Sequence, residues 1–287
     1  MNKDSDKVLI VAEITTNHLG DVELLKKMVR LSKEAGADIV KIQKRDVETF
    51  YAPEHLEKKY ESPFGSTWKE FRHGIELTLE GLQELEEECK KVGIDWFASI
   101  LDLESFKLLQ PFNKKLVKLP STISEHRDFH AKVAEHHKGQ LVISTGYTSQ
   151  EYEEYIQEAF KDAEKIYLLQ CTSAYPPPPE DCNIAVVRHY NELGKKNSKI
   201  VPGYSSHDEG SLGSMLAVAA GAKMIEKHVK IGDTPWMHFQ DVALDLENGE
   251  FAQFVQDVRK AELMCGSETK EIKPSEWHKY THIPKTK

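Results

Sequence analysis

The sequence contains no long hydrophobic run. No apolar stretch in its 287 residues approaches the roughly 20 residues that a transmembrane helix needs. Its polar start, Met1 to Lys7, lacks the hydrophobic segment of a secretory signal peptide. These absences argue against a membrane-spanning protein and predict a cytoplasmic location.

Cysteine pairs and basic tracts are also missing. The four cysteines show no CxxC spacing, which predicts reduced thiols rather than a disulfide framework. A net charge of -9 without a basic tract argues against a nucleic-acid-binding surface. There is no internal repeat and no low-complexity tract. If the ligand of so acidic a protein is an anion, positive charge must be concentrated locally.

What the sequence does contain is a regular alternation of short β-branched runs with amphipathic stretches of helical period. Strands that alternate with helices of about 10–15 residues predict parallel βαβ units. Eight such units predict closure into a single (β/α)8 TIM barrel. The predicted strands are Val8–Glu13, Ile39–Gln43, Trp96–Ile100, Leu116–Leu119, Leu141–Thr145, Ile166–Gln170, Ile200–Tyr204 and Met224–His228.

Two segments do not follow this alternation. About 35 residues separate Gln43 from the predicted helix at Leu79, and this connection is rich in aromatic residues. Connections of that length in a compact domain are usually functional or disordered, and the aromatic content predicts a lid over the barrel mouth. The polar tail predicts a C-terminal extension over 267–287, beyond a catalytic barrel domain over 1–266.

Two neighbouring predicted strands end in histidine, at His207 and His228. Barrel enzymes carry their chemistry at the carboxyl ends of the strands. Because strand side chains alternate between faces, Ser205 shares a face with His207, and Glu226 shares one with His228. The pair of histidines predicts a divalent metal site completed by water or substrate oxygens, which suits Mn²⁺.

Lysines occupy equivalent positions on two other strands. Lys41 and Gln43 share a face of the second predicted strand, and Lys118 lies near the end of the fourth. Unpaired buried charge is costly, so lysines at such positions indicate function rather than stability. Together with serine hydroxyls they predict a site for an anionic, phosphorylated ligand beside the metal.

Seven stretches carry a family resemblance, in order and in register with the predicted strands: Ala12–Asp21, Ala35–Gln43, Val117–Ser121, Ser144–Gly146, Gln170–Pro176, Gly203–His207 and Ile225–His228. Together they resemble the sialic acid synthase family, whose members condense phosphoenolpyruvate with an amino sugar. The resemblance spans residues 8 to about 264. It implies a transferase that joins phosphoenolpyruvate to an N-acetylmannosamine-like or modified aldose, giving a 3-deoxy-2-keto sugar acid and phosphate. It also implies a homo-oligomer, expected to be a dimer.

The resemblance implies roles for individual residues. The catalytic set is Glu13, Lys41, Lys118, His207 and His228, with His207 and His228 as the metal ligands for Mn²⁺, Mg²⁺ or Co²⁺. The substrate-binding set is Asn17, Gln43, Ser99, Ser121, Ser144, Ser173, Tyr175, Ser205 and Asp241. Two further residues keep two interpretations each. His18 is a catalytic or a loop-capping histidine, and Glu226 orients a metal-bound water or ligand, or pairs with a lysine.

The chain also departs from the family pattern. Family members usually continue into a small antifreeze-like domain that contributes an arginine to a partner's sugar site, and this sequence stops without it. Residues that differ from the family pattern occur at four places: Thr15, Ser206, Ala98–Asp102 and Trp236–Asp241. These departures predict a modified or non-standard aldose as acceptor, bound partly by Trp236–Asp241.

Three other functions are considered beside this one. A deoxy-heptulosonate or deoxy-octulosonate phosphate synthase would join phosphoenolpyruvate to another aldose. A metal-dependent barrel hydrolase usually carries His-x-His on its first strand, whereas this strand ends in Glu13, Ile14 and Thr15. A non-catalytic sugar-binding relative would have no use for both lysines and both histidines.

Overall fold

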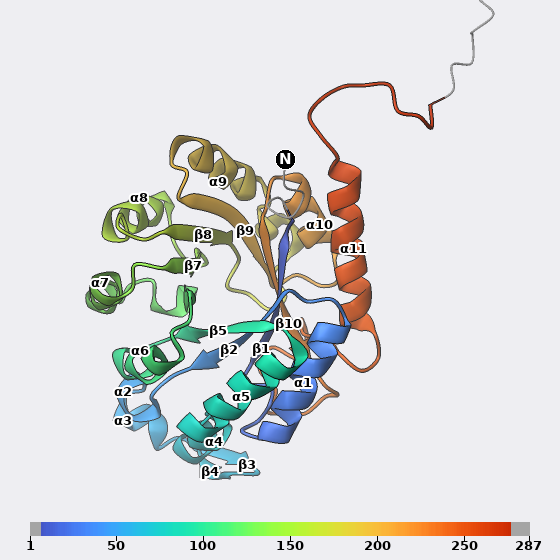
Figure 1. The fold of residues 1–287 in the computed structure, drawn as a ribbon. Coiled ribbons are helices and arrows are strands. Elements are labelled where there is room, and N and C mark those ends of the chain that lie inside the picture. The colour runs from blue at the N-terminus through green and yellow to red at the C-terminus, as the bar shows by residue number, and fades with distance from the viewer. Residues whose placement is uncertain (1–6, 277–287) are drawn as a thin grey trace, which may run out of the picture.

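The strands of the computed structural model, which describes residues 7–276, form a closed parallel barrel (Figure 1). Each barrel strand pairs with the next in chain order, and β1 pairs with β10 to close the ring. This arrangement confirms the predicted (β/α)8 barrel. The barrel strands are β1 (Leu9–Thr15), β2 (Ile39–Lys44), β5 (Asp95–Ile100), β6 (Leu116–Leu119), β7 (Gln140–Ser144), β8 (Lys165–Gln170), β9 (Ile200–Ser206) and β10 (Met224–Lys230), with the short β11 (Leu244–Asp245) beside β10.

Helices surround the strands and cover their outer faces (Figure 1). Local signals fix their ends: Asp21 accepts backbone hydrogen bonds at the start of α1, and Gly93 ends α5 with a positive φ of 70°. The barrel helices are α1 (Val22–Glu34), α5 (Leu79–Val92), α6 (Leu103–Leu109), α7 (Arg127–His136), α8 (Gln150–Ala159), α9 (Ala185–Lys196), α10 (Leu212–Ala219) and α11 (Glu250–Cys265). Single 3₁₀ turns lie at Gln110–Phe112, Ser121–Ile123 and Pro179–Cys182.

The long connection after β2 is folded rather than extended. It contains α2 (Val47–Phe50), α3 (Pro53–Leu56), the hairpin β3 (Lys59–Ser62) and β4 (Gly65–Thr67), and α4 (Trp68–Ile75). The hairpin and α4 lie together at the lower edge of Figure 1, held by an aromatic cluster in which the Trp68 ring lies 5.0 Å from Tyr60 and 5.3 Å from Phe71. The expected lid is thus a small subdomain with its own core.

The largest apolar cluster lies between the outer faces of the strands and helices α1, α5, α10 and α11. Helix α11 contributes Phe251, Phe254, Val255 and Val258, all buried. Beyond Cys265 the described residues form no helix or strand, and the predicted extension over 267–287 lies partly outside the described residues. No helix within residues 7–276 combines the length and apolar character needed to cross a membrane.

Candidate active site at the carboxyl ends of the strands

A cavity of about 260 Å³ opens at the carboxyl ends of the barrel strands. This is the end at which barrel enzymes carry their catalytic residues. The lining side chains come from the ends of β2, β6, β7, β9 and β10 and from loops at the same end of the barrel. They are Lys41, Gln43, Arg45, Phe50, Tyr51, Leu101, Lys118, Pro120, Ser121, Thr122, Ser144, Cys171, Tyr175, Ser205, His207, Glu226, His228, His238 and Phe239.

Two lysines and two carboxylates meet at the base of this cavity, and all four are buried. Lys118 Nζ lies 2.8 Å from Glu226 Oε1 and 3.0 Å from Oε2. Lys41 Nζ lies 2.6 Å from Glu13 Oε2 and 3.2 Å from Glu226 Oε2. For Glu226, the lysine-pairing interpretation is therefore the one that the contacts support.

The burial of these charges shifts their protonation equilibria. Burial lowers the pKa of Lys41 to about 7, although the Glu226 carboxylate opposes this shift. Burial also acts to raise the pKa of Glu226, but the nearby Lys118 and Lys41 outweigh it and hold that pKa at about 2. A phosphate placed beside Lys41 would favour its ammonium form, so anion binding and protonation of this lysine are linked.

Hydroxyl groups surround the lysines. Ser205 donates to Glu226 Oε1 at 2.8 Å, and Ser99 accepts from Lys41 Nζ at 2.9 Å. Ser121 and Ser144 line the cavity directly. Ser173 lies 3.3 Å from Ser121 and lines a neighbouring open groove instead.

The two histidines at the ends of β9 and β10 are buried with their ring centroids 5.6 Å apart. Nδ1 of His207 lies 2.6 Å from the Thr172 carbonyl oxygen, so this nitrogen carries the proton and Nε2 keeps its lone pair. His228 Nδ1 is buried and finds no hydrogen-bond partner among the described residues. Burial lowers the pKa of His207 to about 4 and that of His228 well below its usual value, so both rings are neutral.

Two neutral imidazoles suit a divalent metal whose other ligands are oxygens. Glu226 is already held by the lysines and Ser205, and within residues 7–276 no group of three or more His, Cys, Asp or Glu side chains is arranged to hold a metal ion. The donor set therefore fits a metal completed by water or substrate, not a fully protein-ligated structural site.

Tyr175 forms an aromatic wall over the histidines. Its ring stacks on Phe239 at 3.5 Å between centroids and lies 4.1 Å from the His207 ring. Both rings line the cavity, so one side of the metal-binding region is apolar.

Several predicted site residues do not reach the cavity. Asn17 is buried: its Nδ2 donates to the Val229 carbonyl at 2.9 Å, and its Oδ1 accepts from the His238 amide at 2.7 Å. Its amide therefore holds the loop after β10 in place. Asp241 lies in that loop but is exposed and outside the lining set. His18 Nδ1 accepts a hydrogen bond from the Gly20 amide at 3.0 Å. This contact supports the loop-capping interpretation of His18.

Other cavity residues lie in segments that the sequence indicated but were not placed in the predicted site sets, and His238 and Phe239 belong to the segment Trp236–Asp241 that was expected to contact the acceptor. Arg45 and Tyr51 come from the connection after β2, and His238 and Phe239 come from the loop after β10. Arg45 continues the spacing of Lys41 and Gln43 by two further residues, and this period could have identified it. The others come from loops, whose positions strand periodicity does not predict.

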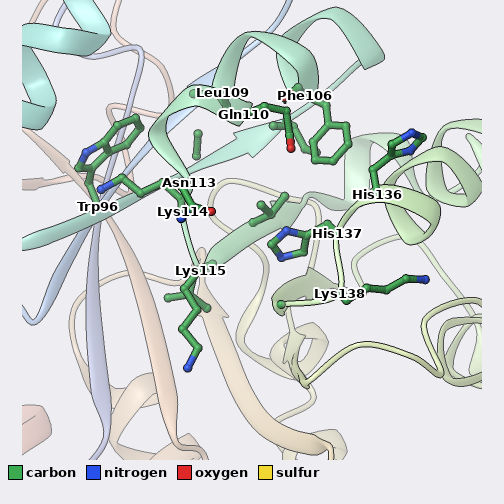
Figure 2. A pocket seen from close by; sticks show the side chains of 15 residues that line it. Trp96, Phe106, Leu109, Gln110, Asn113, Lys114, Lys115, His136, His137 and Lys138 are labelled. Carbon is green, nitrogen blue, oxygen red and sulfur yellow. Dashed lines mark hydrogen bonds between the residues drawn. The ribbon is translucent and has the colours of Figure 1, made fainter.

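A second cavity, of about 410 Å³, lies beside β5, β6 and α6 and is lined by Trp96, Phe106 and Lys114, among others (Figure 2). Lys114 and Lys115 precede β6, and Lys138 precedes β7, so these side chains lie at the amino ends. Lys114 lies 2.6 Å from a Glu86 oxygen, and Figure 2 shows it extending toward Trp96. Because this cavity does not open at the carboxyl ends of the strands, where barrel enzymes carry their catalytic residues, it is not the candidate active site.

The fold and site define a barrel enzyme with two buried lysines at the base of its cavity and a pair of neutral histidines at the strand ends. Residues 28–270 match the model of the NeuB family. The chain is 36% identical to N-acetylneuraminate-9-phosphate synthase of Homo sapiens over 271 residues, which is 93% of this chain and 74% of the relative. It is 30% identical to N,N'-diacetyllegionaminic acid synthase of Campylobacter jejuni over 277 residues, 94% of this chain and 81% of the relative. The protein belongs to the NeuB family.

A solved structure shares the fold. The N-acetylneuraminic acid synthetase of Leptospira borgpetersenii superposes with a TM-score of 0.79 at 24% identity, covering 94% of this chain and 88% of that chain. This similarity extends the barrel assignment over nearly the whole chain.

Proposed function

We propose that the protein is a transferase that condenses phosphoenolpyruvate with the aldehyde of an aldose, giving a 3-deoxy-2-keto sugar acid and inorganic phosphate. The observation that carries this proposal is the convergence of Lys41 and Lys118 with serine hydroxyls at the base of one buried cavity. A phosphate beside a carboxylate needs several charge-assisted donors, and this base supplies them. Membership of the NeuB family supports the same reaction.

In the proposed reaction, Lys41 and Lys118 hold the phosphate and carboxylate of phosphoenolpyruvate, with hydroxyl donors from Ser121, Ser144 and Ser205. The π electrons of phosphoenolpyruvate form a bond from C3 to the aldehyde carbon, whose oxygen takes a proton. Water adds to the electron-poor C2 and loses a proton. Cleavage of the C2–O bond to phosphate, with loss of the second water proton, leaves the ketone. Because the two lysines are already in position before the reaction starts, they can stabilise the negative charge that develops on the phosphate during it.

Glu13 is the proposed proton-transfer group. Its carboxylate lies 2.6 Å from Lys41 Nζ, and Gln43 Nε2 lies 3.4 Å from its other oxygen. A buried carboxylate beside the ligand can accept a proton from water or pass one to the sugar oxygen. Ser99 and Ser173 support this arrangement through Lys41 and Ser121.

His207 and His228 would hold the divalent metal, which we take to be Mn²⁺. Such an ion, when bound, supplies Lewis-acid polarisation of the acceptor's carbonyl oxygen. Tyr175 and Phe239 shield this region from water, and the Thr172 carbonyl fixes the tautomer of His207.

The acceptor in this proposal is an N-acetylmannosamine-like or modified amino sugar that contacts Gln43, Tyr175 and the loop after β10. A cytoplasmic homo-oligomer remains the expectation from the sequence.

The test is release of phosphate from phosphoenolpyruvate with a panel of aldoses, after EDTA treatment and with Mn²⁺ restored. We expect release that requires both an amino sugar and the metal. Preference for a four- or five-carbon aldose phosphate would instead identify a deoxy-heptulosonate or deoxy-octulosonate phosphate synthase. If none of the aldoses in the panel supported phosphate release, the proposal would be contradicted.

A further inference from the structure

Two of the places at which the sequence departs from the family pattern meet in the fold. Thr15 ends β1, and His238 lies 223 residues later, in the loop after β10. Oγ1 of Thr15 lies 3.1 Å from Nδ1 of His238. Thr15 is buried and outside the set of residues that line the cavity, whereas His238 lines it. The contact therefore joins a buried strand end to a side chain of the candidate active site.

The backbone of Thr15 is in an unfavourable conformation. Its φ is +52°, in the left-handed region, where a β-branched side chain crowds the backbone. The pairing of β1 with β2 also shifts register between Glu13 and Thr15. A glycine would adopt this φ without strain, so the backbone alone does not account for a threonine here. Such strain persists where surrounding contacts hold it, and it is concentrated at functional sites.

The hydroxyl of Thr15 can fix the tautomer of His238. It accepts a hydrogen bond from the Thr16 amide, so its own proton can be donated to Nδ1 of His238. Burial, together with Arg45 and Arg72, lowers the pKa of His238 to about 3, so the ring is neutral and carries a single proton. With Nδ1 as an acceptor, that proton lies on Nε2.

The backbone and the ring of His238 are held separately from this contact. Asn17 Nδ2 donates to the His238 carbonyl at 3.3 Å, and Asn17 Oδ1 accepts from the His238 amide at 2.7 Å. The His238 ring lies 3.7 Å from the Phe239 ring, which in turn stacks on Tyr175. The orientation of Nε2 is therefore set before a ligand binds, which lowers the entropic cost of binding.

The chemistry around His238 suits the sugar and not phosphoenolpyruvate. The phosphate and carboxylate of phosphoenolpyruvate are best held by charged donors, which Lys41 and Lys118 supply. His238 offers one uncharged N–H donor beside the aromatic rings of Phe239 and Tyr175, and all three line the cavity. A few placed polar groups on an aromatic wall are what orient a ligand with many hydroxyl groups.

We propose that Thr15 is a positioning residue: it donates to Nδ1 of His238, and His238 donates from Nε2 to an oxygen of the acceptor sugar. This inference rests on the proposed condensation and adds to it the residue pair that orients the acceptor. Because Thr15 acts through His238, its hydroxyl and not its volume is the feature that affects the sugar.

The experiment measures steady-state kinetics for N-acetylmannosamine at saturating phosphoenolpyruvate and Mn²⁺, and for phosphoenolpyruvate at saturating sugar. Thr15→Val keeps the branched shape and removes the hydroxyl. We expect its kcat/KM for the sugar to fall about 3- to 10-fold, as for one neutral hydrogen bond, with the KM for phosphoenolpyruvate unchanged. Thr15→Ser, which keeps the hydroxyl, should retain kcat/KM for the sugar.

Two further variants separate positioning from stability. His238→Ala should lower kcat/KM for the sugar at least as much as Thr15→Val, and the double variant should lose no more than His238→Ala, because the two residues act as one unit. Thr15→Gly removes the hydroxyl together with the strain. It should match Thr15→Val in its sugar kinetics while keeping a melting temperature close to that of the unmodified protein.

Thr78→Val is the matched control, because the Thr78 hydroxyl caps α5 and accepts from the Gly81 amide at 3.2 Å. It should lower the melting temperature and leave the sugar kinetics unchanged. Normal sugar kinetics in Thr15→Val, additive losses in the double variant, or an equal loss for phosphoenolpyruvate would each overturn the inference. If Thr15→Val does not fold, Thr15→Gly and His238→Ala decide in the same way.

Failure of the proposed function is recognised separately, as an absence of phosphate release with every aldose. If release requires an aldose other than N-acetylmannosamine, the same variants are compared with that aldose. If there is no release at all, calorimetric titration of N-acetylmannosamine into the protein decides. Binding that is weakened in Thr15→Val and His238→Ala but retained in Thr15→Ser and Thr78→Val supports the inference. Binding that is absent or equal in all forms overturns it.

Discussion

Lys41 contacts two carboxylates, so its replacement has two separable effects. Lys41→Met removes a charge-assisted contact to phosphoenolpyruvate, and we expect kcat/KM for this substrate to fall about 30- to 1000-fold. It also leaves Glu13 buried without its cation, which lowers the free energy of unfolding by about 3–5 kcal/mol. Steady-state kinetics at varied phosphoenolpyruvate and thermal melting measure the two effects.

Lys27→Met is the control for this substitution. Lys27 forms an ion pair with Glu247 at the surface, where both side chains are nearly half exposed. Such a pair contributes about 0–1 kcal/mol, and kinetics should not change. A Lys41→Met protein that turns over phosphoenolpyruvate normally would show that this lysine belongs only to a structural ion pair.

His207 and His228 are expected to bind metal without supporting the fold, because they lie at the strand ends and not in the apolar layers. His207→Ala and His228→Ala should each lose activity and bound Mn²⁺ while keeping the far-ultraviolet circular dichroism of the barrel. Equilibrium binding followed by electron paramagnetic resonance measures the metal directly. His189→Ala, which removes a half-exposed partner of Glu153, should bind Mn²⁺ normally. Full metal binding in the double variant His207→Ala, His228→Ala would contradict the assignment.

Individual contacts were less predictable from the sequence than individual positions. Alternation along β10 places Glu226 and His228 on one face, and both side chains line the cavity. Periodicity could not name Lys118 as the partner of Glu226, because 108 residues separate them. Asn17 was expected to bind substrate, but its amide is used by the loop after β10. Both the Lys118–Glu226 ion pair and the contacts of Asn17 depend on tertiary packing, which the periodicity of a strand does not describe.

At the level of elements, Glu86 connects α5 to the start of β5 and to the segment before β6. It accepts from Trp96 Nε1 and pairs with Lys114 and Lys90. Burial acts to raise the pKa of Glu86, but Lys114, Lys90 and Trp96 outweigh it and lower that pKa to about 2. Because the folded pKa lies below the usual 4.5, the stabilisation is complete above pH 4.5 and is lost as the pH falls toward 2.

Glu86→Gln should therefore reduce the free energy of unfolding at neutral pH, and its difference from the unmodified protein should shrink as the solution is acidified. Denaturant unfolding at a series of pH values measures this difference. Glu87→Gln, an exposed change on the same helix, should stay within about 0.5 kcal/mol of the unmodified protein. A difference for Glu86→Gln that grows on acidification would reverse the expected sign.

The barrel elements were predictable because each carries its own periodic signal. The predicted strand Ile39–Gln43 agrees with β2 to within one residue, and the helix predicted at Leu79 is α5, which begins at that residue. The connection between them was expected to be a lid, and its fold into α2, α3, a hairpin and α4 was not predicted. Elements of three to eight residues are too short to show a clear period. The capping box formed by Thr67 and Glu70 was the local signal for α4.

At the scale of the whole molecule, closure of the barrel was predictable by counting units, whereas the distribution of charge was not. The net charge of -9 describes an acidic protein. Beside the cavity, however, Lys44, Arg45 and Arg72 surround the single carboxylate of Glu76, because the folded connection brings Arg72 and Glu76 back to the end of β2. Local charge at a site depends on this return of the chain and not on composition.

Closure also makes the last helix part of the cooperative unit. Phe251 of α11 is fully buried in the cluster that spans α1, α5 and the outer faces of the strands. Phe251→Ala should lower the free energy of unfolding by about 3–5 kcal/mol through lost burial and a residual cavity. At about 2–4 °C per kcal/mol, the melting temperature should fall by roughly 10 °C.

The matched control is Leu263→Ala on the same helix, because Leu263 is 83% exposed and should change stability by less than about 0.5 kcal/mol. Below its melting transition Phe251→Ala should keep the KM for phosphoenolpyruvate, since Phe251 does not line the cavity. If Phe251→Ala melted like Leu263→Ala, α11 would be a separately unfolding appendage. If the KM rose with the fold intact, the outer cluster would help to position the strand ends as well as stabilise the barrel.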